Sequence, residues 1–192
     1  MGKNVIGMQP RDVTKLGLCR SFQIPQVFLS GTVLQNMMIA YGLAEEHGFG
    51  LLAQLYSDAR VQRVEEHMAR FKIGDYRGVP TGELPQGVRK LVDIAMATVR
   101  QPRLLMLDEP TSGISVEEKF GLMDIIMAVL KQERTTVLFI EHDMEIVERY
   151  VSRVLAFYQG AIICDAPTAE AMQNESVKEF VVGHNPIGNG NA

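Results

Sequence analysis

The chain has 192 residues, enough for one domain with a sizeable core, and its 46% hydrophobic and 22% charged residues are typical of a globular protein. Its formal net charge is −4, and its arginines are scattered rather than grouped in one stripe, which argues against nucleic acid as the main partner. No apolar stretch is long enough to span a bilayer, and no apolar h-region follows Lys3, so neither a membrane helix nor a secretory signal is predicted in these residues.

Three helices are predicted in the first half of the chain. Thr32 can cap the first of them, which runs to about Tyr41. Residues 74–86 are rich in glycine and proline and are expected to form a loop, and the third helix is predicted at about residues 88–100. A charged, amphipathic second helix is indicated by apolar residues at helical spacing, namely Val61, Val64, Met68 and Phe71.

Residues 104–113, with the sequence LLMLDEPTSG, are the most informative segment of the chain. The four apolar residues at 104–107 have the length and bulk of a strand buried on both faces of a parallel sheet. Asp108 and Glu109 follow at its carboxyl end, where open α/β sheets bind their ligands. Such a pair suits nucleotide hydrolysis, in which the first carboxylate holds Mg²⁺, usually through water, and the second polarises an attacking water. The simpler alternative is a buried strand followed by an acidic turn.

A second strand is predicted at residues 135–140, because TTVLFI is β-branched and apolar, and the polar residues 141–143 follow it. Strand, helix and strand form a βαβ unit with a right-handed crossover, so both strands deliver polar residues to one edge of a sheet. Ser115 and Glu118 have the spacing of a capping box at the start of the connecting helix. That helix is indicated by the spacing of Phe120, Met123, Ile126, Met127 and Leu130.

A hairpin is predicted from residues 154–158 and 161–164. Two short helices are predicted at residues 168–172 and 176–182, and residues 184–192 are expected to form a frayed tail. Cys19 and Cys164 lack metal-ligand spacing and are expected to be small buried hydrophobic residues. His142 stands out because it follows a predicted buried strand beside an acidic-ended one. The other histidines have no partner at ligand spacing and are expected to be exposed: His47, His67 and His184.

Five motifs, in family order, resemble those of the nucleotide-binding subunits of ATP-binding-cassette (ABC) transporters. Residues 104–109 resemble the Walker B strand with its catalytic glutamate, and residues 20–23 (RSFQ) resemble the Q-loop. Residues 84–88 (LPQGV) take the place of the LSGGQ signature, residues 111–115 that of the D-loop, and His142 that of the switch histidine. The resemblance covers nearly the whole chain. Within the family, the chain most resembles the importers of branched-chain amino acids and their urea and amide relatives. This finer resemblance rests on short sequence matches at residues 22–23, 32–36 and 141–144.

The resemblance implies an α/β fold, a partial P-loop NTPase-like ABC ATPase core at residues 1–30 and 101–183, with an inserted helical subdomain at residues 31–100. The phosphate loop, G-x-x-x-x-G-K-[ST], is absent from the sequence, whose only Gly-Lys pair is at residues 2–3. By resemblance the chain begins after this loop and lacks the first strands of the core. A truncated or misread gene start is therefore expected, with a phosphate-loop segment encoded just upstream, in preference to a purpose-built degenerate protein.

The resemblance also implies ATP and Mg²⁺ as cofactors. Asp108 and Gln23 would be the metal ligands, Glu109 would orient the attacking water and His142 would stabilise the γ-phosphate. Gln23 would also report the nucleotide state to the helical subdomain. The residues implied in nucleotide binding are Gln23, Leu84, Pro85, Gly87, Asp108 and Ser112.

The signature departs from the family pattern, because only Leu84 and Gly87 match it. Pro85 stands where a serine hydroxyl would donate to phosphate, Gln86 replaces the first glycine and Val88 the terminal glutamine. The signature opens a helix, so its N–H groups and positive dipole end would meet the γ-phosphate of a nucleotide shared with a second subunit. Proline is tolerated in a first helical turn, and the helix itself is therefore expected to form.

Three functions stay open from the sequence. The first is the energising subunit of an importer, the second a non-enzymatic ABC-like subunit that contributes only a half-site to a complete ATPase partner. The third, a soluble ABC ATPase of translation or DNA repair, is disfavoured because long heptads and a basic patch are absent. The first implies transmembrane permease subunits and a second ABC ATPase subunit, identical or different, as partners. It also implies a location on the cytoplasmic face of the plasma membrane, with no nucleic acid bound and no direct contact with the transported substrate.

Overall fold

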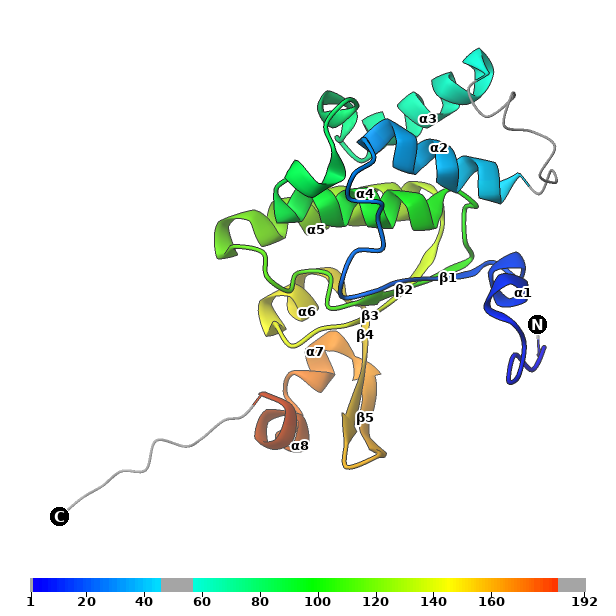
Figure 1. The fold of residues 1–192 in the computed structure, drawn as a ribbon. Helices are drawn as coiled ribbons and strands as arrows, with labels where there is room; N and C mark the ends of the chain where they lie inside the picture. The colour runs from blue at the N-terminus through cyan, green and yellow to red at the C-terminus, as the bar shows by residue number, and fades with distance from the viewer. Residues whose placement is uncertain (1, 46–56, 183–192) are drawn as a thin grey trace. The chain divides into compact units, whose positions relative to one another are not determined.

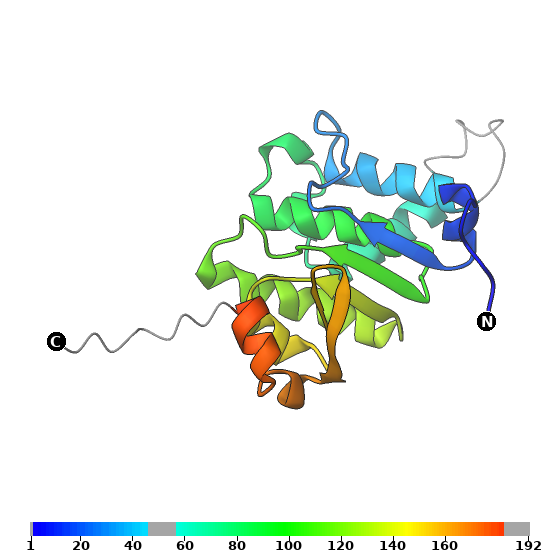
Figure 2. The same ribbon diagram turned by 90° about the horizontal axis from the view of Figure 1, so that it is seen from below.

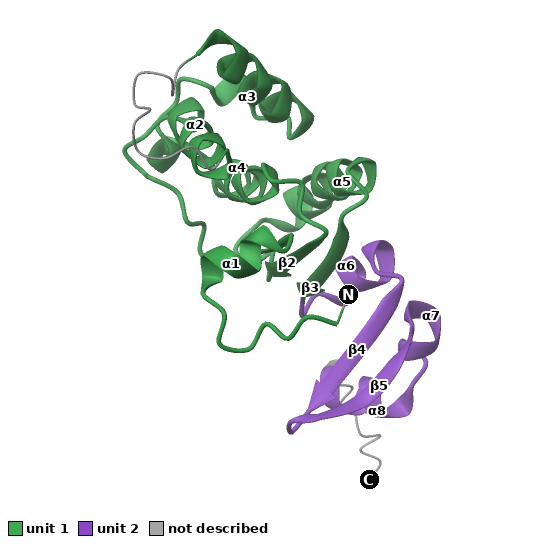
Figure 3. Ribbon diagram, turned by 90° about the vertical axis from the view of Figure 1, so that its right-hand side faces the viewer, with its two compact units in different colours: residues 1–140 green, residues 141–192 purple. Residues whose placement is uncertain are grey.

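A computed structural model describes residues 2–45 and 57–182, and the chain divides into two compact units, residues 1–140 and 141–192 (Figures 1 and 3). Among the described residues, no helix is both long and apolar enough to cross a membrane. The predicted division into a core, a helical subdomain and a tail stays a prediction.

The first unit contains a three-stranded parallel sheet (Figure 2). Its order is β1 (Leu18–Ser21), β2 (Leu104–Asp108) and β3 (Thr136–Ile140). In the register, Ser21 lies opposite Leu107, and Asp108 lies opposite Ile140, so the three strands end at one edge. The predicted parallel pairing of two strands is confirmed, and β1 is a third strand that the sequence analysis did not identify.

In the first unit, helices cover one face of the sheet in more than one layer (Figure 1). The helices of this unit are α1 (Pro10–Lys15), α2 (Val33–Ala44), α3 (Asp58–Arg70), α4 (Gln86–Thr98) and α5 (Val116–Gln132), with 3-10 turns at Gly74–Tyr76 and Thr81–Glu83 in the predicted loop. Thr32 caps α2 as predicted: its Oγ1 accepts from the Gln35 amide at 3.2 Å, and Gln35 Oε1 accepts from the Thr32 amide at 2.8 Å.

The predicted capping box of α5 is wrong. Ser115 is the N-cap residue, but its hydroxyl donates to Glu118 Oε2 at 3.1 Å instead of accepting from a backbone N–H. A hydrogen bond to a charged carboxylate is stronger than one between neutral groups, which explains this preference.

The prediction that residues 104–107 are buried on both faces is only partly correct. Leu105 and Leu107 are fully buried, whereas Leu104 and Met106 are half-buried, and Leu138 and Ile140 of β3 are exposed. A parallel strand is buried throughout only where helices cover both faces of its sheet. In the first unit α4 and α5 lie on one face, so alternate side chains lack such cover (Figure 1).

The second unit consists of α6 (Met144–Tyr150), a hairpin of β4 (Arg153–Tyr158) and β5 (Ala161–Pro167), and the short turns α7 (Thr168–Ala171), α8 (Glu175–Val177) and η4 (Lys178–Val182). The hairpin is confirmed, and Gln159 and Gly160 both have the positive φ, 47° and 81°, that a two-residue type I′ turn needs. Cys19 and Cys164 are free and buried, as predicted. The predicted tail, His47 and His184 lie outside the described residues.

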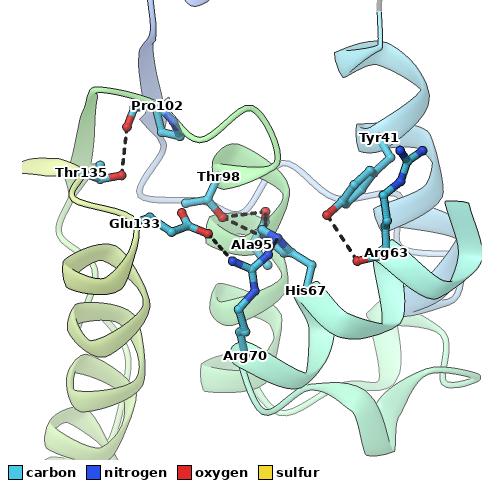
Figure 4. A network of polar contacts seen from close by, with 9 residues as sticks. All are labelled: Tyr41, Arg63, His67, Arg70, Ala95, Thr98, Pro102, Glu133 and Thr135. Carbon is cyan, nitrogen blue, oxygen red and sulfur yellow. Dashed lines mark hydrogen bonds and ion pairs between the residues drawn. The ribbon is translucent and has the colours of Figure 1, made fainter. Parts of the chain in front are cut away.

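The prediction that His67 is exposed is wrong, because its side chain on α3 is only 1% exposed. Its Nε2 lies 3.0 Å from the Ala95 carbonyl oxygen, and Arg70 Nη2 lies 2.8 Å from its Nδ1 (Figure 4). Burial and the Arg70 charge lower the pKa of His67 to about 4, so the ring is neutral at physiological pH. Position 67 shares a helical face with Val64 and Phe71, and that spacing could have indicated its burial.

Candidate functional site

The carboxyl edge of the sheet joins residues from distant parts of the chain. Gln23 follows β1 and Glu109 follows β2, and Gln23 Nε2 donates to Glu109 Oε2 at 2.6 Å. The Glu109 amide donates to the Ile140 carbonyl oxygen at 3.0 Å, so the end of β3 also lies here. Two of the predicted site residues, 86 positions apart, are therefore in direct contact.

Glu109 has an unusual backbone conformation. Its φ is 44°, in the left-handed region that costs a non-glycine residue about 1–2 kcal/mol. Strain of this kind concentrates at functional sites, where the surrounding structure holds it in place. Here the Glu109 carbonyl oxygen accepts from the Ser112 amide at 3.1 Å, so a tight turn directs the chain away from the strand end.

Asp108 is held by an ion pair with Arg20, whose Nη2 lies 2.5 Å from Asp108 Oδ2. Both side chains are partly exposed, so the pair stabilises the fold by no more than about 1 kcal/mol. The oxygen donors of Asp108, Glu109 and Gln23 are of the kind that Mg²⁺ prefers. The described residues contain no cluster of three His, Cys, Asp or Glu side chains suited to a metal. Mg²⁺ usually takes one or two carboxylates and completes its shell with water and phosphate, so the adjacent carboxylates of Asp108 and Glu109 fit it, and Arg20 would compete with it for Asp108.

The signature segment leads into α4, as predicted. Leu84 is buried, Pro85 is the N-cap residue and the helix begins at Gln86, so proline does not prevent it from forming. Gln86 Nε2 donates to the Ser112 carbonyl oxygen at 3.3 Å, which ties the start of α4 to the turn after Glu109. The adjacent Gly113 has a φ of 74°, and a Cβ atom there would overlap the Gln86 carboxamide.

His142 belongs to the second unit, in the turn before α6, and its amide donates to Glu141 Oε2 at 3.3 Å. Its predicted contact with a γ-phosphate stays a prediction. The neighbouring Asp143 has a structural role, because its Oδ1 caps α6 by accepting from the amides of Glu145 and Ile146 at 3.0 and 3.5 Å.

Sequence analysis missed two charged residues on α4 that contact the Q-loop. Asp93 accepts from the Ser21 hydroxyl at 2.5 Å and from the Gln26 amide at 2.8 Å. Lys90 Nζ donates to the carbonyl oxygens of Phe22 at 2.8 Å and Gln23 at 3.1 Å. Burial raises the pKa of Asp93, although both hydrogen bonds and the nearby Lys90 charge oppose that rise. The available signal was a pair of opposite charges, three residues apart, next to the apolar residues 91–92 and 94–96 of the helix.

The same loop presents an apolar surface. Four large apolar side chains on it and just after it are exposed: Phe22, Ile24, Phe28 and Leu29. Exposed apolar side chains that are grouped on one segment of the chain are candidates for an interaction surface.

The family model for ABC transporter proteins matches residues 7–112 of this chain. The probable branched-chain amino acid transport ATP-binding protein LivG of Archaeoglobus fulgidus is 26% identical over 185 residues, 95% of this chain and 72% of that protein. The high-affinity branched-chain amino acid transport ATP-binding protein BraF of Pseudomonas aeruginosa is 26% identical, over 95% of this chain and 74% of that one. The solved ADP conformation of MJ1267, an ATP-binding cassette of an ABC transporter, has a TM-score of 0.72 at 25% identity, covering 95% of this chain and 74% of that chain.

Proposed function

The chain belongs to the ABC transporter family of ATP-binding proteins, as its motifs predicted, and has the α/β fold expected of that family, and we propose that it energises an importer of branched-chain amino acids or related small amides. In this role it couples ATP hydrolysis to transport and does not touch the transported substrate. The observation that carries the proposal is the 2.6 Å hydrogen bond from Gln23 to Glu109, which joins a Q-loop glutamine to the candidate catalytic carboxylate. The LivG and BraF relatives support the substrate class.

Asp108 and Gln23 hold Mg²⁺ in this proposal, through a carboxylate and a carboxamide oxygen. The bound ion supplies charge neutralisation on the nucleotide phosphates. Glu109 accepts a hydrogen bond from the attacking water and orients it, in place of the bond that it now accepts from Gln23. His142 donates to the γ-phosphate. The contact between Gln23 and Glu109 thereby links the occupancy of the site to the Q-loop.

Permease subunits are the proposed partners of the exposed apolar surface formed by Phe22, Ile24, Phe28 and Leu29. Docking there places the chain on the cytoplasmic face of the plasma membrane and next to the loop that carries Gln23. The second proposed partner is another ABC ATPase subunit, because Leu84, Pro85, Gly87 and Ser112 serve a nucleotide that two subunits share. A different subunit with an intact signature is favoured, since Pro85 offers neither an N–H nor a hydroxyl to phosphate.

Hydrolysis also requires a phosphate loop, which these 192 residues do not contain. We therefore expect the isolated chain to be inactive. The altered signature favours a second candidate function, in which the chain binds a complete ATPase partner and contributes a half-site without hydrolysing ATP.

Leucine uptake in the source organism tests the proposal. The gene is deleted, and the strain is complemented with the wild-type gene, with Glu109→Gln, or with Glu117→Gln as a control on the exposed first turn of α5. We expect radiolabelled leucine uptake to be lost in the deletion strain and with Glu109→Gln, and restored by the other two genes. Undiminished leucine uptake in the deletion strain would refute branched-chain amino acids as the transported substrates. Restored uptake with Glu109→Gln would favour the non-catalytic function.

A further inference from the structure

Lys90 and Asp93 are buried charges on one face of α4. They are three residues apart, so they lie about one helical turn from each other, and their residues are only 4% and 6% exposed. Lysine and aspartate are almost never fully buried unless they are paired, because removing a charge from water is costly. An apolar pair would stabilise the same helix without that cost. These two side chains therefore serve contacts that apolar groups cannot make.

Those contacts go to one short loop, residues 21–26, which includes the Q-loop glutamine Gln23. The Asp93 carboxylate joins both ends of the loop, because it accepts from Ser21 at the end of β1 and from the amide of Gln26. Lys90 donates to the two carbonyl oxygens between them, those of Phe22 and Gln23. Ile24 is 74% exposed and Phe22 48%, so neither side chain anchors the loop in the apolar core. The position of the loop therefore depends on the polar contacts with α4.

The first residue of the same helix, Gln86, contacts the turn that follows Glu109. Gln86 bonds the Ser112 carbonyl oxygen, three residues after Glu109, while Gln23 bonds Glu109 itself. We propose that Lys90 and Asp93 are positioning residues that fix the Q-loop to α4 and thereby hold Gln23 beside Glu109. In terms of the proposed function, on which this consequence rests, the two residues keep a proposed metal ligand next to the proposed catalytic carboxylate.

The side-chain carboxamide of Gln23 reports this positioning directly. In the full 192-residue chain labelled with ¹⁵N, its resonance is identified by its loss in Gln23→Ala. It should shift in Glu109→Gln, because the charged acceptor is removed. We expect Lys90→Met and Asp93→Leu to move the resonance and to abolish its response to Glu109→Gln. The conservative variants Lys90→Arg and Asp93→Asn should retain both the resonance and the response.

Two further measurements separate positioning from stability. Arg89→Met is the matched control, because Arg89 bonds the carbonyl oxygens of Thr81, Gly82 and Leu84 and not the Q-loop, so the Gln23 resonance should not move. Hydrogen exchange of the Gln26 amide should accelerate roughly ten-fold in Asp93→Leu, the scale of one lost hydrogen bond to a charged group, and not in Arg89→Met.

A Gln23 resonance that still responds to Glu109→Gln in Lys90→Met and Asp93→Leu would overturn the proposal, as would unchanged exchange at Gln26. If Asp93→Leu fails to fold, Ser21→Ala removes one donor to the same carboxylate and should also shift the Gln23 resonance. An unshifted resonance in Ser21→Ala would likewise count against it. Neither measurement uses nucleotide or permease, so failure here leaves the result of the leucine uptake experiment unaffected.

Discussion

Acidification should destabilise the first unit through His67. Arg70 stays protonated and donates to Nδ1, so the neutral ring carries its proton on Nε2, 3.0 Å from the Ala95 carbonyl oxygen (Figure 4). A proton on Nδ1 would face the Arg70 N–H group, so two hydrogen-bond donors would repel each other and the hydrogen bond would be lost. The site is buried next to the Tyr41 and Phe71 rings, so water cannot readily compensate. Glu133, which pairs with Arg70 at 2.7 Å, is the neighbouring negative charge.

The size of the effect follows from the pKa of His67, which is about 4 in the folded state and 6.5 for an unperturbed histidine. Because the folded pKa is lower, the unfolded chain binds more protons between these two values. The contribution of His67 is therefore fully present above about pH 6.5 and is lost as the pH falls toward 4. A difference of about 2.5 pKa units corresponds to about 3 kcal/mol of unfolding free energy.

Urea unfolding followed by circular dichroism, between about pH 7 and pH 4, measures this loss. The reference is His67→Gln, which does not titrate. Burial raises the pKa values of Asp93 and Glu133, which changes stability in the opposite direction, but both proteins contain these groups. The difference in unfolding free energy between wild type and His67→Gln should shrink by about 3 kcal/mol over this range. A difference that does not change with pH would refute the reasoning.

Four further outcomes are expected. Arg70→Met should lower the unfolding free energy by about 3 kcal/mol, because it removes the cation that pairs with the buried Glu133 carboxylate. The Glu133 side chain is only 4% exposed, and its Oε2 already lacks a hydrogen-bond partner. Adding Glu133→Leu to Arg70→Met should recover most of this loss in urea unfolding. Gly113→Ala should lower the melting temperature, because position 113 has a left-handed φ and the new Cβ would overlap the Gln86 carboxamide. The decrease should be smaller in the double variant Gly113→Ala with Gln86→Ala, and an equal decrease in the single and double variants would exclude the overlap. The isolated chain should show no micromolar Mg-ATP binding and no hydrolysis, so tight Mg-dependent binding in calorimetry would contradict the requirement for a phosphate loop. Pro85→Ser with Gln86→Gly should raise the ATPase rate of the assembled transporter about ten-fold, as one charge-assisted hydrogen bond allows, and an unchanged rate would show that this half-site is silent.

Residue patterns alone were sufficient to predict the local elements and the chemistry at their ends. Apolar runs of strand length predicted β2 and β3, and their parallel pairing followed from the helix between them. The acidic pair Asp108 and Glu109 was predicted at the strand end because its position depends only on neighbouring residues. The hairpin turn at Gln159 and Gly160 was predicted for the same reason.

Contacts between distant groups, in contrast, depend on how the separate segments pack. The contact of Gln23 with Glu109 spans 86 positions and that of Asp93 with Ser21 spans 72, and no local period encodes either. The strand β1 is four residues long, too short for a periodic signal, and is defined by its pairing with β2. His67 can be buried because other segments supply its polar partners. Ala95 of α4 accepts from its ring, and Glu133 at the end of α5 holds Arg70, which in turn bonds the ring. Periodicity indicates which face of an element is covered, but the hydrogen-bond partners of a buried polar group are fixed only when separate segments pack together.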